Sequence, residues 1–220
     1  MSGYVVIVMD TSYICHCYMR KVCKKSHYPH ESVNDMENFE EYEKEKKTIN
    51  IYTANGVGLA ITGAAAILFG VPFYLIWGLN SFLSLQQVLL FILLFVAGIV
   101  IHELIHGFFF GLFAKNRFKS IRFGVMWQML TPYCHCKEPL RIKHYFLGAL
   151  MPALLLGIIP AVIALFNGSG MMLLFGVLFT GAAAGDFMVV WILRKEHPDT
   201  YVQDHPSEAG CFVYRKREGG

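Results

Sequence analysis

The sequence is poor in charged residues, which make up only 16% of it, whereas 55% is hydrophobic and its mean hydropathy is +0.45. These values exclude an ordinary soluble domain. About 20 consecutive apolar residues are needed for a helix to cross the hydrocarbon core of a bilayer. Stretches of that length with almost no charge predict four transmembrane helices, at about 52–79, 88–114, 145–166 and 171–193.

The sequence also lacks a recognisable signal peptide and an internal repeat. The start, MSGYVVIVMD, has no basic region before its apolar run, and that run is too short to be a signal. We therefore expect the first span to stay in the mature protein. The absence of a repeat argues against transporters built from inverted repeats. Spans one and three contain no ionisable side chain in their apolar cores, so any polar chemistry must use spans two and four.

Charge is missing from two of the connections between spans. The segments NSFLSLQQ, between spans one and two, and NGSG, between spans three and four, carry none. The positive-inside rule then predicts a multi-pass cell-membrane protein with both termini and the 2–3 loop in the cytoplasm. Nothing indicates a nucleic-acid partner; the expected surroundings are the lipid bilayer. The basic residues that set this orientation include Lys115, Arg117, Lys119, Arg122, Lys137, Arg141 and Lys143 in the 2–3 loop, and Arg194, Lys195, Arg215, Lys216 and Arg217 after span four.

The predicted fold class is an all-α membrane protein with four transmembrane helices. Its expected parts are a polar cytoplasmic N-terminal segment at 1–50, the membrane domain at 51–195 and a cytoplasmic tail at 196–220. In the first part, YVVIVM could form a short strand and NFEEYEKEKK a charged helix, although a solvated segment is the preferred interpretation. Two prolines, Pro152 and Pro160, predict a kink in span three.

The 2–3 loop has a pattern of its own. Its alternating piece IRFGVMW is followed by a turn containing proline and by the short run PLRIK. This is typical of a short β-hairpin at the membrane surface, with an irregular loop as the alternative.

All six cysteines fall in segments that this topology places in the cytoplasm, where disulfides are rare. Two Cys-His-Cys triplets, at 15–17 and 134–136, raise the alternative of a structural zinc site. The Cys-x-Cys spacing suits a tetrahedral site less well than the Cys-x2-4-Cys spacing of zinc modules. Reduced thiols are the simpler interpretation, and both stay open.

Span two contains HELIH at 102–106, a His-Glu-x-x-His motif. On a helix, His102 and His106 lie one turn apart on one face, so that two imidazoles can bind one cation. Glu103 lies about 100 degrees further round and can act as general base on a bound water without being a ligand. A chance match would bury the carboxylate in lipid at a cost of about 2.5 to 3.5 kcal/mol. Because Zn²⁺ would offset that cost, we expect a zinc site here.

Catalytic zinc normally has three protein ligands and a water, so one ligand is still missing. Asp186, in GAAAGDFMVVW, is the only ionisable residue within span four. It lies 15 residues after Met171, and His102 lies 14 residues after Val88, so both should sit at one depth. The small residues of GAAAG permit close helix approach. We expect Asp186 to be the third ligand; an Asp beside a local kink is the alternative.

Other polar residues are weaker candidates. His144, at the membrane edge of span three, is the one expected to contact a metal ligand or the substrate. His144 and Asp204 would also be the replacements for Asp186 if it lay far from the histidines. Asp204 and the remaining candidates, His135, Glu138 and His205, are all expected at the surface.

At this point the chain resembles the site-2 protease class of intramembrane metalloproteases, and more closely a bacterial family of small zincin-like membrane proteins of unknown function. The resemblance rests on HELIH, on LGALMP at the start of span three, on Gly185-Asp186 and on the tail QDHPSEAGCFVY. It covers about residues 88–212. The sequence departs from the class where Gly185-Asp186-Phe187 replaces the usual Leu-Asp-Gly, and where the Asn that often follows the span-three Gly-Pro has no counterpart.

The resemblance implies a three-helix zincin core of spans two, three and four, with zinc near the cytoplasmic side. It implies cleavage of a membrane protein or peptide substrate, with Glu103 as base. The 2–3 hairpin could hold the substrate as an added strand. Two alternatives remain: a non-catalytic zinc protein that binds a client, and a small metal or ion transporter using His102, Glu103, His106 and Asp186 as a relay. Oligomeric state stays open.

Overall fold

The computed structural model describes residues 41–78, 85–126, 131–206 and 208–217, all within the unit Asn38–Gly220. The segment YVVIVM and the Cys-His-Cys triplet at 15–17 lie outside the described residues. Within the described part, three helices are long and apolar enough to cross a membrane, and a bent helix pair makes a fourth candidate span. The prediction of a membrane protein is therefore supported.

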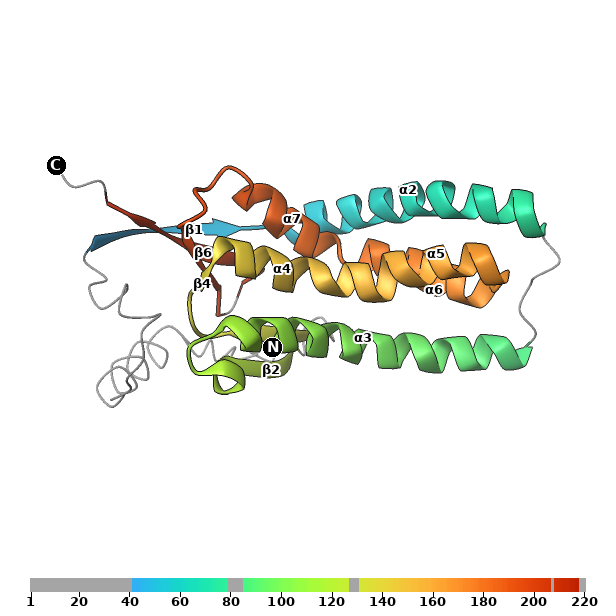
Figure 1. Ribbon diagram of the computed structural model, residues 1–220, viewed down its shortest axis with the longest axis horizontal. Helices are drawn as coiled ribbons and strands as arrows, with labels where there is room; N and C mark the ends of the chain where they lie inside the picture. The colour runs from blue at the N-terminus through green and yellow to red at the C-terminus, as the bar shows by residue number, and fades with distance from the viewer. Residues whose placement is uncertain (1–40, 79–84, 127–130, 207, 218–220) are drawn as a thin grey trace, which may run out of the picture. The chain divides into compact units, whose positions relative to one another are not determined.

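The four candidate spans run side by side (Figure 1). Asn50 begins the first by accepting hydrogen bonds from the N–H groups of Tyr52 (2.8 Å) and Thr53 (3.4 Å). Gly168, with φ +70°, ends the third in the left-handed conformation that favours glycine. The spans comprise α2 (Ile51–Trp77), α3 (Leu85–Phe113), the run α4 (Ile142–Pro152), η4 (Ala153–Ile158) and α5 (Ile159–Asn167), and the pair α6 (Gly170–Ala182) and α7 (Ala184–Leu193).

Spans three and four are both irregular. In span three, the π-helical stretch η4 directly follows Pro152 and ends just before Pro160, which has no N–H to donate. In span four, α6 and α7 meet at a 41° bend around Ala183. The bend places Asp186 in the first turn of α7.

The small residues at this bend pack differently from the prediction. A Cβ on Gly181 would lie 1.7 Å from Thr62 Oγ1 of α2, and a Cβ on Gly58 of α2 would touch Ala184. The GAAAG run therefore lets span four approach α2, whereas it was expected to bring that span towards α3.

The all-α prediction is wrong in one respect, because the chain also forms a four-stranded antiparallel sheet. Its first strand covers most of the NFEEYEKEKK segment, for which a helix or a solvated coil was expected. This segment forms a strand and not a helix, because each of its residues from 42 to 48 pairs with a residue of a strand near the C-terminus. The strand order is β1 (Tyr42–Thr48), β6 (Gly210–Lys216), β5 (Tyr201–Asp204) and β4 (Leu140–Arg141).

The 2–3 loop contains the expected hairpin, but with another second strand. After the short helix η3 (Arg117–Ser120), β2 (Ile121–Met126) pairs with β3 (Thr131–Cys136). The run PLRIK contributes β4 to the larger sheet instead. The prediction missed β3 because its proline suggested a turn.

The hairpin and η3 both pack closely on α3 at glycines. A Cβ on Gly107 would lie 2.3 Å from the ring of Phe123, and one on Gly111 would lie 2.5 Å from the ring of Phe118. The main buried cluster lies between the larger sheet and the ends of α3, α4 and α7. It includes Phe110, Cys136, Leu140, Ile142, Tyr145, Leu193, Val202, Cys211 and Val213.

Candidate metal centre

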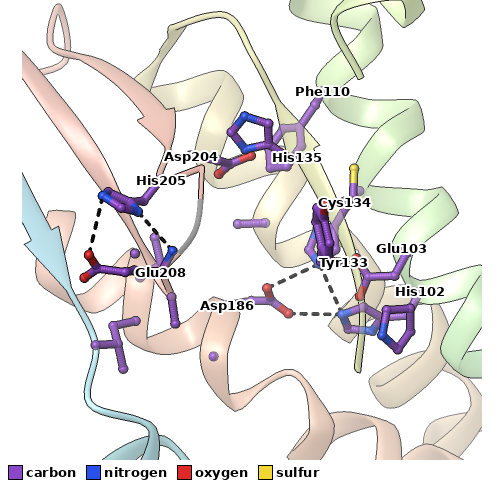
Figure 2. A pocket seen from close by; sticks show the side chains of 18 of the residues that line it. His102, Glu103, Phe110, Tyr133, Cys134, His135, Asp186, Asp204, His205 and Glu208 are labelled. Atoms are coloured by element: carbon purple, nitrogen blue, oxygen red, sulfur yellow. Dashed lines mark hydrogen bonds and ion pairs between the residues drawn. The ribbon is translucent and has the colours of Figure 1, made fainter. Parts of the chain in front are cut away.

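Three predicted ligands converge between α3 and α7. His102 Nε2 lies 3.1 Å from His106 Nε2 and 3.3 Å from Asp186 Oδ2, and His106 Nε2 lies 3.2 Å from Asp186 Oδ1. Figure 2 shows Asp186 pointing across to His102. All three side chains are mostly buried, with 12%, 9% and 23% of their side-chain surface exposed. Within the described residues, this is the group of His, Cys, Asp and Glu close enough to hold a metal ion.

Two contacts on the side away from the cluster fix the orientation of the His106 ring. Its Nδ1 lies 3.0 Å from the carbonyl oxygen of Gly148 on α4. Because a carbonyl can only accept, Nδ1 carries the proton, and Nε2 of the neutral ring keeps its lone pair towards the cluster. Phe110, one turn further along α3, stacks on the same ring at 5.8 Å between centroids. The ring is therefore set in both tautomer and angle.

These donors fit zinc. Three ligand atoms bound tetrahedrally at about 2.0 to 2.2 Å lie about 3.3 to 3.6 Å from one another. The observed separations of 3.1 to 3.3 Å are within a few tenths of an ångström of that spacing. Two imidazoles and one carboxylate would leave a fourth position open, which is the arrangement of a catalytic zinc site.

Glu103 follows His102 on α3 and lines the same cavity as the three converging residues. Its carboxylate accepts a hydrogen bond from the backbone N–H of Cys134 on β3. The hairpin therefore orients Glu103 directly. In Figure 2 Glu103 lies beside His102, facing Cys134.

The cluster forms one side of a cavity of about 730 Å³. The hairpin supplies one wall, and the start of α2 with the β5–β6 connection supplies another. This volume is in the range of ordinary ligand-binding pockets. Residues of these walls include Ile49, Ala54, Val125, Pro132, Tyr133, Cys134, His135, Asp204, His205, Glu208 and Gly210.

Asp204 lies in the cavity wall rather than at the surface, where it was expected. It accepts hydrogen bonds from the N–H of Cys136 (2.8 Å) and the hydroxyl of Tyr145 (2.7 Å). Burial raises the pKa of Asp204, although both hydrogen bonds oppose the shift. Burial likewise lowers the pKa of His135, against the attraction of Asp204.

The remaining candidates are not brought to the cluster. His144 stacks on Phe113, with ring centroids 4.1 Å apart, and does not line the cavity. Cys136 is 1% exposed, and burial raises the pKa of its thiol to about 12. Because a metal-binding cysteine must be a thiolate, this environment favours the reduced-thiol interpretation of the triplet at 134–136.

Two features of the centre had no signal in the sequence. The Gly148 carbonyl and the Cys134 N–H are backbone groups, so no side-chain pattern marks them. No motif in the sequence marks Asp204 or Tyr145, because they are 59 positions apart and come into contact only in the folded protein.

Comparisons with known proteins agree with this chemistry. No curated protein and no solved structure matches the chain significantly. Residues 93–201 match the model of a family described as "Putative zincin peptidase". That segment contains the HELIH motif, the hairpin and Asp186. Over these residues, just under half of its length, the chain is similar to that family.

Proposed function

We propose that this protein is a zinc-dependent membrane endopeptidase that cleaves a membrane protein or peptide. One observation carries the proposal: His102, His106 and Asp186 converge in a cavity that also holds Glu103. The similarity to a zincin family supports the same reaction class. Three apolar spans, or four with the bent pair, support a substrate that reaches the site from the membrane.

His102, His106 and Asp186 would hold the ion. When bound, zinc would polarise the peptide carbonyl and lower the pKa of a water towards about 7. Glu103 accepts the proton of the attacking water, supported by the Cys134 N–H, and then passes it to the leaving amine. The carbonyl of Gly148 keeps the His106 ring in its productive tautomer.

The substrate would bind in an extended form along the outer edge of β3. Cys134 and Cys136 donate their N–H groups away from β2, to Glu103 and Asp204, so the carbonyls of Cys134 and Pro132 also point outward. A substrate strand along this edge would therefore find hydrogen-bond acceptors, the two carbonyl oxygens, and no free donors. A substrate peptide with proline at the paired positions should be a poor one, because proline has no N–H.

We also propose that both termini and the 2–3 loop face the cytoplasm. Cys136 is too buried to label, so the test uses Lys137→Cys, at the exposed position directly after β3. An impermeant maleimide added to intact cells should leave it unmodified until the cells are broken. Modification in intact cells would reverse the orientation.

The experiment for the activity uses the purified full chain in liposomes. A fluorogenic peptide library carrying a transmembrane segment should be cleaved, and a chelator should abolish cleavage. The same preparation is assayed for zinc flux. Flux without cleavage would favour a transporter, and retained zinc with neither would favour a non-catalytic binding protein.

A further inference from the structure

One edge of β3 has two outward N–H groups, and each meets a carboxylate. Cys134 donates to Glu103 of α3, and Cys136 donates to Asp204 Oδ2 at 2.8 Å. The two residues are neighbours on the same side of the strand, since alternate residues of an antiparallel strand turn their N–H groups the same way. Any shift of β3 at Cys136 therefore moves the N–H that orients Glu103.

The second oxygen of Asp204 reaches α4. Its Oδ1 accepts the Tyr145 hydroxyl at 2.7 Å, and the Tyr145 ring stacks on Phe110 at 5.3 Å between centroids. Phe110 in turn stacks on His106. Gly148, three residues after Tyr145 on α4, has its carbonyl oxygen 3.0 Å from His106 Nδ1. Asp204 thus joins the strand that orients the base to the helix that orients a predicted ligand.

Asp204 is itself held in a fixed place. It is the last residue of β5, where it pairs with Cys211 of β6 in the middle of the larger sheet. Both of its oxygens are occupied by donors from other elements. It is not part of the group that could hold a metal ion, so a role as fourth ligand is not supported.

We propose that Asp204 is a positioning residue of the peptidase, which holds the edge of β3 against α4 so that the Cys134 N–H keeps Glu103 directed into the cavity. This inference rests on the proposed function. It assigns a catalytic purpose to Asp204, which lies just beyond the segment 93–201 similar to the zincin family.

The test compares Asp204→Asn and Tyr145→Phe with a matched control, Tyr214→Phe. The Tyr214 hydroxyl also donates to a side chain, Gln203 Oε1 at 2.8 Å, but Tyr214 does not line the cavity. Asparagine has one acceptor and one donor group where Asp204 needs two acceptors. We expect kcat to fall about tenfold to a hundredfold in Asp204→Asn, a typical cost of losing an orienting partner. Zinc content should stay within about twofold of wild type, because the ligands remain, and KM should rise by a smaller factor than kcat falls, because the substrate also binds the edge of β3.

Two further readouts separate positioning from general stability. Amide hydrogen exchange of the β3 peptide should accelerate in Asp204→Asn and Tyr145→Phe but not in Tyr214→Phe. In a Glu103→Asp background, whose shorter side chain already fails to reach its place, Asp204→Asn should cost less than about twofold in kcat.

The outcomes are distinct. A wild-type protein that cleaves no peptide refutes the proposed function. Whether or not it cleaves, unchanged hydrogen exchange of β3 in Asp204→Asn refutes the positioning role of Asp204. If the wild type is active, Asp204→Asn with full kcat overturns the inference. So does a loss that is equally large in the Glu103→Asp background, or one that comes entirely from lost zinc.

Discussion

The two halves of α3 obey different rules. In the first half, leucines such as Leu85, Leu89 and Leu93 are mostly exposed on an apolar helix, as expected for residues that face lipid. In the second half, one face of the helix, with His106, Gly107, Phe110 and Gly111, is buried against α4, the hairpin and η3. Lipid accepts almost any apolar side chain, whereas a packed partner accepts few. Apolar substitutions should therefore be tolerated at the exposed leucines of the first half and be costly on the buried face of the second.

The largest effect is expected at the ligands. Asp186→Asn should lose zinc and reduce cleavage below detection, because a neutral amide is a poorer ligand and no longer balances the charge of the ion. Leu93→Ala, in the lipid-facing half, is the control and should retain both. Zinc content and peptide cleavage are measured on the same purified samples. Full zinc occupancy in Asp186→Asn would remove Asp186 from the ligand set.

The next largest effect is expected at Glu103, beside the ligands but outside their set. Glu103→Gln should keep the metal and lose activity by about a hundredfold to ten-thousandfold, the usual cost of removing a general base. The assay pairs metal analysis with single-turnover cleavage. Loss of zinc would make Glu103 a ligand, and full activity would refute its assignment as base.

A smaller effect should follow from adding a side chain at Gly107, where the hairpin packs on α3. In Gly107→Ala the new methyl group meets Phe123 at 2.3 Å and Ile121 at 3.1 Å. Because the Phe123 ring is half exposed, it can move, and the strain should lower the free energy of unfolding by about 1 kcal/mol. The displaced hairpin carries the Cys134 N–H that orients Glu103, so kcat should fall as well. Gly70→Ala on α2 is the matched control, since nothing lies within 4 Å of its Cβ position. Equal activity of the two variants would show that close packing of the hairpin on Gly107 is not needed for catalysis.

The smallest effect concerns the ion network outside the membrane spans. Hydrogen bonds from Arg215 and Lys47 lower the pKa of Glu196 from 4.5 to about 2. A lowered pKa means that this stabilisation is present above pH 4.5 and is lost as the pH falls towards 2. The contribution should be at most about 1 kcal/mol, as for other ion pairs near the surface. The thermal stabilities of wild type and Glu196→Gln should therefore differ at neutral pH and converge as the pH falls from 4.5 towards 2. A constant difference would contradict the assignment.

The same contrast explains what the sequence could predict. The spans follow from hydropathy, and HELIH with the lone Asp186 of span four indicates a metal site, because burying charge in an apolar helix needs a reason. The four-stranded sheet could not be predicted in this way. Its strands are short and far apart, and YEKEKKT has few residues typical of strands. Ion pairs of Lys46, Lys47 and Glu45 with C-terminal partners support it instead.

The central claim is that one zinc ion is bound by two imidazoles and one carboxylate. X-ray absorption at the zinc edge of the purified full chain tests it most directly. We predict only nitrogen and oxygen neighbours, at about 2.0 to 2.2 Å, and loss of this signal in Asp186→Asn. Sulfur neighbours at about 2.3 Å would assign the zinc to the Cys-His-Cys triplets and contradict the account.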